Sequence, residues 1–153
     1  MLAYIWFRFE FPFALGAIVA LLHDIILTMG VFAVLGLEFN LATVAAILLI
    51  IGYSMNDTVV VYDRIRENLR KFKKMNLNEL LDKSINQTLS RTINTTVTTI
   101  LALGALYIFG GQIIADFAFA MLWGIVVGTY SSIFIASPIL VYVNVRRNKE
   151  TES

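Results

Sequence analysis

Four long hydrophobic segments constrain the fold more than any other feature of this sequence. Residues 13–35, 41–61, 92–109 and 117–145 each approach or exceed the roughly 20 apolar residues that a helix needs to cross a bilayer. Hydrophobic residues make up 58% of the chain and charged residues 15%, too little polar surface to cover a water-soluble domain. We therefore predict an all-α integral membrane protein, a transmembrane helix bundle with four complete spans.

The first residues resemble the end of a further helix. Met1–Phe7 is apolar but too short to span a bilayer, and no small-residue cleavage site follows it. We interpret 1–7 as the end of a truncated helix that precedes the first complete span. The sequence 1–153 then forms a single transmembrane domain of a longer protein.

The placement of charge predicts the orientation of the bundle. Eight of the twelve Lys and Arg residues lie in 62–91, and the others are Arg8 and three residues of the tail after 145. With four spans, all of these fall on one side of the membrane, and the turns on the other side, 36–40 and 110–115, have none. By the positive-inside rule, the basic region 62–91 and the C-terminus are expected to be cytoplasmic.

The basic region itself has helical periodicity. Ile65, Leu69 and Phe72 form an apolar stripe opposite Arg66, Arg70 and Lys74. Either the preceding helix continues past the lipid as an amphipathic helix at the interface, or this stripe docks a partner. Asn76 followed by Glu79 resembles a capping box, which predicts that a new helix starts near Leu77 and runs through Arg91 into the membrane.

One carboxylate, Asp57, lies inside an apolar span. A charged residue at the centre of a membrane helix costs roughly 2.5–3.5 kcal/mol on insertion scales, so it usually has a function. At about 1.5 Å per residue, Asp57 lies about 9 Å beyond the midpoint of its span, toward the basic side. The same estimate puts the Arg91 backbone within about 5 Å of that depth, a distance that a long arginine side chain can cover.

Two interpretations of an Asp57–Arg91 pair remain open on these grounds. Burial raises the pKa of a carboxylate, whereas a nearby arginine lowers it. A site with both influences can bind and release a proton, and proton relays in membrane pumps are built from such residues. Alternatively, the pair is a static contact that holds helices together in a structural scaffold. Ser54 and Asn56 could hydrogen-bond neighbouring groups in either case.

A second polar site is His23-Asp24, at the midpoint of the first span. Asp24 must face protein or water, and His23 is interpreted as a polar packing residue. Asp24 and Asp57 together raise the alternative of an intramembrane aspartyl protease. Their depths differ by about 9 Å, too far for two carboxyls to share a proton unless a helix is broken.

Small residues recur every fourth position along the last span, at Ala120, Gly124, Gly128, Ser132 and Ala136. Such a face lets helix backbones approach closely in lipid. It serves either to pack against a neighbouring helix of the same bundle or as a dimerisation surface. There is no cysteine and one histidine, so no metal site or cofactor is expected.

Several stretches resemble a known family. GYSMNDTVVVYDRIRENLRK, INQTLSRTINTTVTTILALGALYIFGG, IADFAFAMLWGIVVGTYSSIFIASPI and, earlier, FRFEFPFALGAIVALLHD closely resemble the SecF family of bacterial protein translocase subunits. These subunits belong to the SecD/SecF group of resistance–nodulation–division (RND) type membrane proteins. The resemblance covers nearly the whole chain.

The resemblance implies a function and partners. It implies an accessory, non-enzymatic subunit of the bacterial inner membrane that acts with SecD and the SecYEG channel. This subunit would use the proton-motive force to move exported, unfolded polypeptides. It would contact the lipid bilayer and have no nucleic-acid partner. The intramembrane acid of the family corresponds to Asp57 and its basic neighbour to Arg91. The family also has an earlier helix and a periplasmic domain that this sequence lacks.

Overall fold

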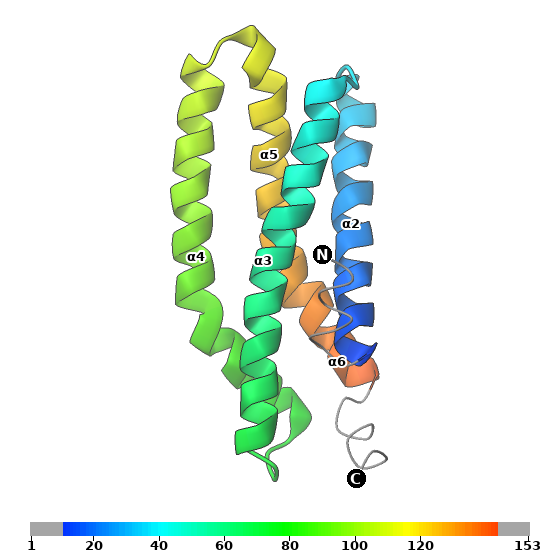
Figure 1. Ribbon diagram of the computed structural model, residues 1–153, viewed down its shortest axis with the longest axis vertical. Helices are drawn as coiled ribbons and strands as arrows, with labels where there is room; N and C mark the ends of the chain where they lie inside the picture. Colours follow the sequence, from blue (N-terminus) through cyan, green and yellow to red (C-terminus); the bar gives the residue numbers. More distant parts are fainter. Residues whose placement is uncertain (1–10, 144–153) are drawn as a thin grey trace.

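The computed structural model describes residues 11–143, apart from the side chain of residue 113, as a bundle of long helices (Figure 1). Helix α2 covers Phe11–Leu35, α3 covers Leu41–Lys71 and α4 covers Leu77–Phe109. The chain then continues through α5 (Gln112–Ser131), the π-helical segment η1 (Ser132–Ala136) and α6 (Ser137–Tyr142). Residues 1–7, which we interpreted as a helix end, lie outside the described residues, and so does the basic tail.

Two glycines make the tight turns at one end of the bundle. Gly36 ends α2 and Gly111 precedes α5, both with a positive φ that other residues rarely adopt. Asn40 then begins α3 with a capping box, in which its side chain accepts the Thr43 N–H and the Thr43 hydroxyl receives the Asn40 N–H. Both turns fall where the sequence predicted them.

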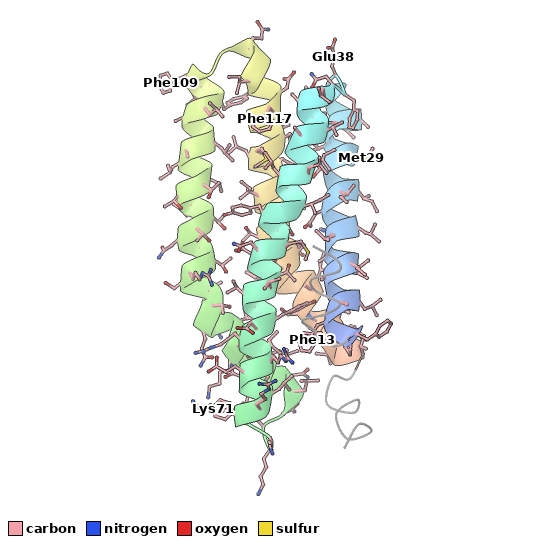
Figure 2. The ribbon with its side chains drawn as sticks, viewed as in Figure 1. Phe13, Met29, Glu38, Lys71, Phe109 and Phe117 are labelled. Carbon is pink, nitrogen blue, oxygen red and sulfur yellow. The ribbon has the colours of Figure 1, made fainter. Side chains whose placement is uncertain are left out.

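At the other end, α3 and α4 extend beyond their apolar parts and are joined by a short connection, residues 72–76, which we call the hook. The predicted amphipathic stripe is confirmed, because Ile65 and Leu69 are buried while Arg70 is exposed. The predicted start of α4 at Leu77 is also confirmed, although Asn76 caps the Asn78 N–H without a reciprocal bond from Glu79. In Figure 2, Lys71 lies at this end, and Phe109 and Glu38 lie at the opposite end.

The last span, predicted over 117–145, is not one regular helix in the described residues. It begins earlier, at Gln112, and widens into the π-helical turn η1 before α6. Pro138 explains the position of this turn, because its ring has no N–H to donate and clashes with the carbonyl one turn earlier.

The outer surface of the bundle is apolar, unlike that of a water-soluble protein. Large apolar residues point outward all around the bundle, including Val34 at 84% exposure, while serine, threonine and aspartate side chains are buried. In the part of the chain that the structure describes, four helices are long and apolar enough to cross a membrane. The predicted all-α membrane class is confirmed, with α2, α3, α4 and the α5–α6 run as the four spans.

Helix α5 lies inside the bundle and packs against α2, α3 and α4. Its small residues make this possible: a Cβ added at Gly124 would collide with the Ile50 side chain of α3, and one at Gly128 would press on Ser54. Ala120 and Ala136, on the same face, are fully buried. The small-residue face therefore lies against α3 within the bundle.

Replacing Gly124 with valine should separate α3 from α5. We expect Gly124→Val to lower the free energy of unfolding by about 1–3 kcal/mol, the usual cost of overpacking a core. Gly104→Val is the matched control, because a Cβ at Gly104 meets no atom within 4 Å. Thermal unfolding in detergent measures both, and adding Ile50→Ala should restore part of the loss. Equal stability of the two valine variants would contradict the close α3–α5 contact.

Candidate functional site

Asp57 lies on the inner side of α3, with only 4% of its surface exposed. Helical spacing places it on the buried side together with Ile50, Ser54 and Val61. Its Oδ2 atom is buried and receives no hydrogen bond from any described residue. A carboxylate oxygen without a donor is an unusual group in a protein interior, because burial without a partner is costly.

Arg91 lies on α4, the helix that packs beside α3 at this depth. Its charge interacts favourably with Asp57, but no direct ion pair joins the two side chains within residues 11–143. Arg91 is exposed on the bundle surface, whereas Asp57 is inside it. The two residues are therefore electrostatic neighbours that remain separate.

Asp24 has the opposite environment. It is fully buried in α2, and its Oδ2 atom accepts hydrogen bonds from Ser54 of α3 at 2.6 Å and Ser131 of α5 at 2.9 Å. His23 contacts the other oxygen, Nδ1 to Oδ1, at 3.2 Å. Asp24 thus joins three helices through one carboxylate.

A row of hydroxyls follows α3 at four-residue spacing, and we call it the α3 seam: Ser54, Thr58 and Tyr62. Ser54 donates to Asp24, Thr58 and Ser132 share a hydrogen bond at 2.9 Å, and the Tyr62 hydroxyl donates to the Ala136 carbonyl at 2.9 Å. A Cβ at Gly16 would collide with the Tyr62 hydroxyl, so glycine is needed there. The seam fixes α3 against α5 and the π-helical turn on the side adjoining Asp57.

The other two polar residues predicted within the membrane, His23 and Asn56, differ in their burial in the bundle. His23 is partly buried beside Asp24. Asn56 is exposed on the outer side of α3, away from the seam. The structure therefore brings His23 and Asp24 together, and it places Asn56 apart from them.

Sequence reasoning missed Ser131 and Tyr62, and it named Ser132 only as a small residue of the helix face and not for its hydrogen bonds. The available signals were two adjacent serines in an otherwise apolar run and the i, i+4, i+8 spacing of Ser54, Thr58 and Tyr62. Neither signal shows which helices face each other. The bonds depend on α5 reaching α3 closely, which only the assembled bundle specifies.

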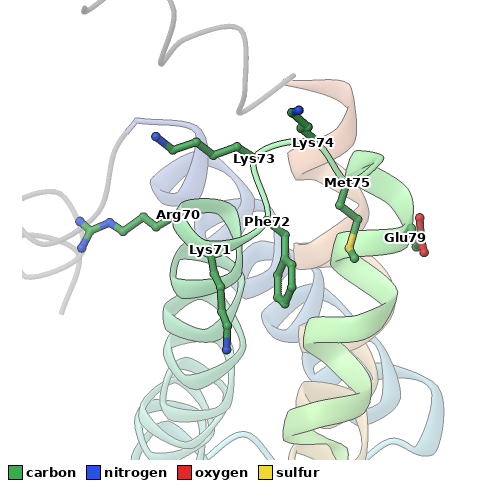
Figure 3. Close-up of a pocket in the computed structure, with 7 residues that line it drawn as sticks. All are labelled: Arg70, Lys71, Phe72, Lys73, Lys74, Met75 and Glu79. Atoms are coloured by element: carbon green, nitrogen blue, oxygen red, sulfur yellow. The ribbon is translucent and has the colours of Figure 1, made fainter.

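A basic pocket of about 610 Å³ lies at the hook (Figure 3). Figure 3 shows the Phe72 and Met75 side chains both extending toward the space between the helix ends, while the Lys73 side chain points away from them. The Lys83 ammonium lies 4.1 Å from the centre of the Phe72 ring, a cation–π contact that fixes this ring against α4. The pocket lies well beyond the apolar parts of the helices, far from Asp57 and Asp24. Among the described residues, no cluster of three or more His, Cys, Asp or Glu side chains could hold a metal ion.

Comparison with known proteins gives a consistent result. A family model described as "Protein export membrane protein SecD/SecF, C-terminal" matches residues 1–146. The protein translocase subunit SecF of Rhodobacter capsulatus is 57% identical over 147 residues, covering 96% of this chain and 44% of that protein. SecF of Rickettsia rickettsii is 56% identical over 151 residues, covering 98% of this chain and 49% of that protein.

A solved structure has the same arrangement of helices. The crystal structure of SecDF in its super-membrane-facing form superposes with a TM-score of 0.91 at 46% identity. The match covers 99% of this chain and 21% of that one. The chain spans about half the length of the curated relatives it matches.

The bond between Tyr62 and the π-helical turn can be tested directly. Tyr62→Phe removes the hydroxyl donor to the Ala136 carbonyl, and we expect a loss of about 1 kcal/mol in unfolding free energy. Hydrogen exchange at residues 136–140 should also become faster. Tyr130→Phe, at an exposed tyrosine of α5, is the control and should change neither quantity. Unchanged exchange in the Tyr62 variant would contradict the assignment of this bond.

Proposed function

The chain belongs to the SecD/SecF family of protein export membrane proteins, and from this premise we propose that it is the membrane part of an accessory subunit of the bacterial Sec export machinery. Proteins named SecF at over half identity, across nearly the whole chain, support this proposal. The chain is a multi-pass membrane protein. Its activity is proton-motive-force-driven assistance to secreted polypeptides, and it acts as a transport component, not an enzyme.

The observation that carries the proton role is the unpartnered Oδ2 atom of buried Asp57. A carboxylate that is satisfied by fixed donors has little reason to exchange a proton, whereas one that lacks a donor gains from binding a proton or water. Arg91 lies on the neighbouring helix α4 and forms no ion pair with Asp57 in the described part of the chain, so it leaves the carboxylate oxygens open. In this proposal, Asp57 takes up and releases protons, and Arg91 stabilises it between those steps.

The same geometry supports transport over the two alternatives. A static scaffold would be expected to satisfy Asp57 as fully as it satisfies Asp24. In an aspartyl protease two carboxyls share a proton, but the Asp24 oxygens accept from Ser54 and Ser131 and contact His23. The difference between the two aspartates therefore favours a relay by Asp57 alone.

The outer face of α4 supports a membrane partner. Arg91 and Asn94 are exposed on one side of this spanning helix, where lipid would be a poor environment for their polar groups. Asn56 is exposed on the neighbouring helix α3. We assign these surfaces to SecD, with the SecYEG channel and the unfolded exported chain as further partners of the whole complex.

Charge placement supports the orientation, with the hook in the cytoplasm of a bacterial inner membrane protein. The hook and the last turn of α3 carry Arg70, Lys71, Lys73 and Lys74, whereas the turns at the other end of the bundle carry none of the basic residues. Anionic lipids of the inner leaflet favour the same orientation.

Replacement of Asp57 tests the proton role. Asp57→Asn in the full-length subunit should abolish proton-driven stimulation of export into membrane vesicles, because the amide cannot bind and release a proton. Asp63→Asn, at an exposed aspartate two turns further along α3, is the matched control and should keep the stimulation. Stimulation that survives Asp57→Asn would exclude the relay and favour the scaffold.

Arg91→Met tests the basic neighbour. It removes the charge but keeps an unbranched side chain, and we expect a loss of stimulation of at least about tenfold, the effect of a coupling near 1.4 kcal/mol. Arg70→Met, at an exposed arginine near the hook, serves as the control. Export at the normal rate with Arg91→Met would show that Asp57 acts without it.

Single cysteines test the orientation, because these 153 residues contain none. A membrane-impermeant thiol reagent should label Lys73→Cys in inside-out vesicles and Glu38→Cys in right-side-out vesicles. The reverse pattern would invert the proposed topology. Labelling of both positions from one side would contradict four spans.

A further inference from the structure

Two carboxylates are buried among the described residues, and they differ in how they are bonded. Both oxygens of Asp24 are engaged, Oδ2 by two serine hydroxyls and Oδ1 by His23. No described residue donates to Oδ2 of Asp57. The proposed relay uses Asp57 and leaves Asp24 without a role.

The hydrogen bonds of Asp24 connect it to the turn of α3 that carries Asp57. Ser54, which donates to Asp24, lies three residues before Asp57 on the same helix. Ser131, the other donor, precedes Ser132, whose hydroxyl lies 2.9 Å from that of Thr58 and 3.4 Å from the Ser54 carbonyl. Asp24 therefore fixes both helices whose contact flanks Asp57.

We propose that Asp24 is a positioning residue for Asp57. By accepting hydrogen bonds from Ser54 and Ser131, Asp24 fixes the register of α3 against α5. In this register no described residue donates a hydrogen bond to Asp57 Oδ2, although Ser54 and Thr58 lie three residues before it and one residue after it. The proposal rests on the proton role of Asp57 proposed above. It assigns to Asp24 a structural function as a hydrogen-bond acceptor and not that of a second proton carrier.

The chemistry of the bonds distinguishes these two functions. An asparagine side-chain oxygen has two lone pairs and can accept from both serines as the carboxylate does. Its charge, however, is zero. If Asp24 acts as an acceptor, Asp24→Asn keeps the register; if Asp24 carries protons or charge, the same variant fails.

Few ionisable groups surround this region, so changes in its pH response can be attributed. The ionisable groups that the packed helices bring to it are His23 and Asp24 from α2, Tyr53, Asp57 and Tyr62 from α3, and Arg91 from α4. Helix α5 and the π-helical turn contribute the hydroxyls of Ser131 and Ser132.

The test uses the full-length subunit with its partners in proteoliposomes, with proton movement measured under an imposed gradient across a range of pH. We expect Asp24→Ala to lower the rate about tenfold and to displace the midpoint of its pH profile, because two buried hydroxyls lose their acceptor. Asp24→Asn should keep at least about half of the rate and the original midpoint. Ser131→Ala, which removes one donor, should have an intermediate effect.

Thr28→Val is the matched control for folding. Thr28 is also buried in α2, but its hydroxyl bonds within the helix to the Asp24 carbonyl and not to α3 or α5. It should behave as the natural protein. A normal rate and midpoint in Asp24→Ala would overturn the proposal, as would an Asp24→Asn variant as defective as Asp24→Ala, which would instead assign Asp24 a charge-carrying role.

A disulfide measures the register itself, independently of proton movement. Thr58→Cys with Ser132→Cys replaces two hydroxyls that lie 2.9 Å apart in a chain with no other cysteine. Oxidation should cross-link them in the natural background and with Asp24→Asn, and several-fold less with Asp24→Ala. Equal cross-linking in all three overturns the proposed role of Asp24 even if Asp57 is the relay. Unimpaired proton movement with Asp57→Asn instead overturns the relay, while the cross-link still reports whether Asp24 sets the register.

Discussion

The close contact between α3 and α5 is the interaction on which the rest of the bundle depends. In lipid, no hydrophobic force favours one helix pairing over another, so steric fit and interhelical hydrogen bonds decide which helices meet. Gly124 and Gly128 remove the side chains that would keep the backbones apart. Only at that separation can short hydroxyl side chains such as Ser54 and Ser132 bridge the two helices.

This contact also explains why two buried aspartates have different chemistry. Asp24 is opposite the serines that α5 brings to α3, and its oxygens are occupied. Asp57 is offset from the α3 seam by one position, about 100° around the helix, and misses those donors. The π-helical turn before Pro138 places the Ala136 carbonyl against Tyr62 and continues the seam toward the end of the bundle that carries the hook.

Much of the fold follows from the sequence, because lipid imposes strong length and polarity requirements. The spans, the glycine turns, the amphipathic end of α3 and the start of α4 at Leu77 were all predictable from local patterns. The depth estimate also placed Arg91 near Asp57. Patterns could not predict which helices face each other, so the bonds of Ser131, Ser132 and Tyr62 were missed. The π-helical turn was missed as well, because Pro138 predicts a bend but not the form that the backbone takes around it.

The hook joins two helix segments of equal length, the end of α3 and the start of α4, which we call the arms. Fourteen residues separate Asp57 from Lys71 on α3, and fourteen separate Leu77 from Arg91 on α4, or about 21 Å along each helix. Asn68 bonds both Ser84 and Gln87, and Arg64 also bonds Gln87, so the arms are clasped between the hook and the proposed pair. Beyond these hydrogen bonds, the distance between the two helices follows from the angle between them. A small change in distance between Asp57 and Arg91 is thereby coupled to the angle between two membrane helices.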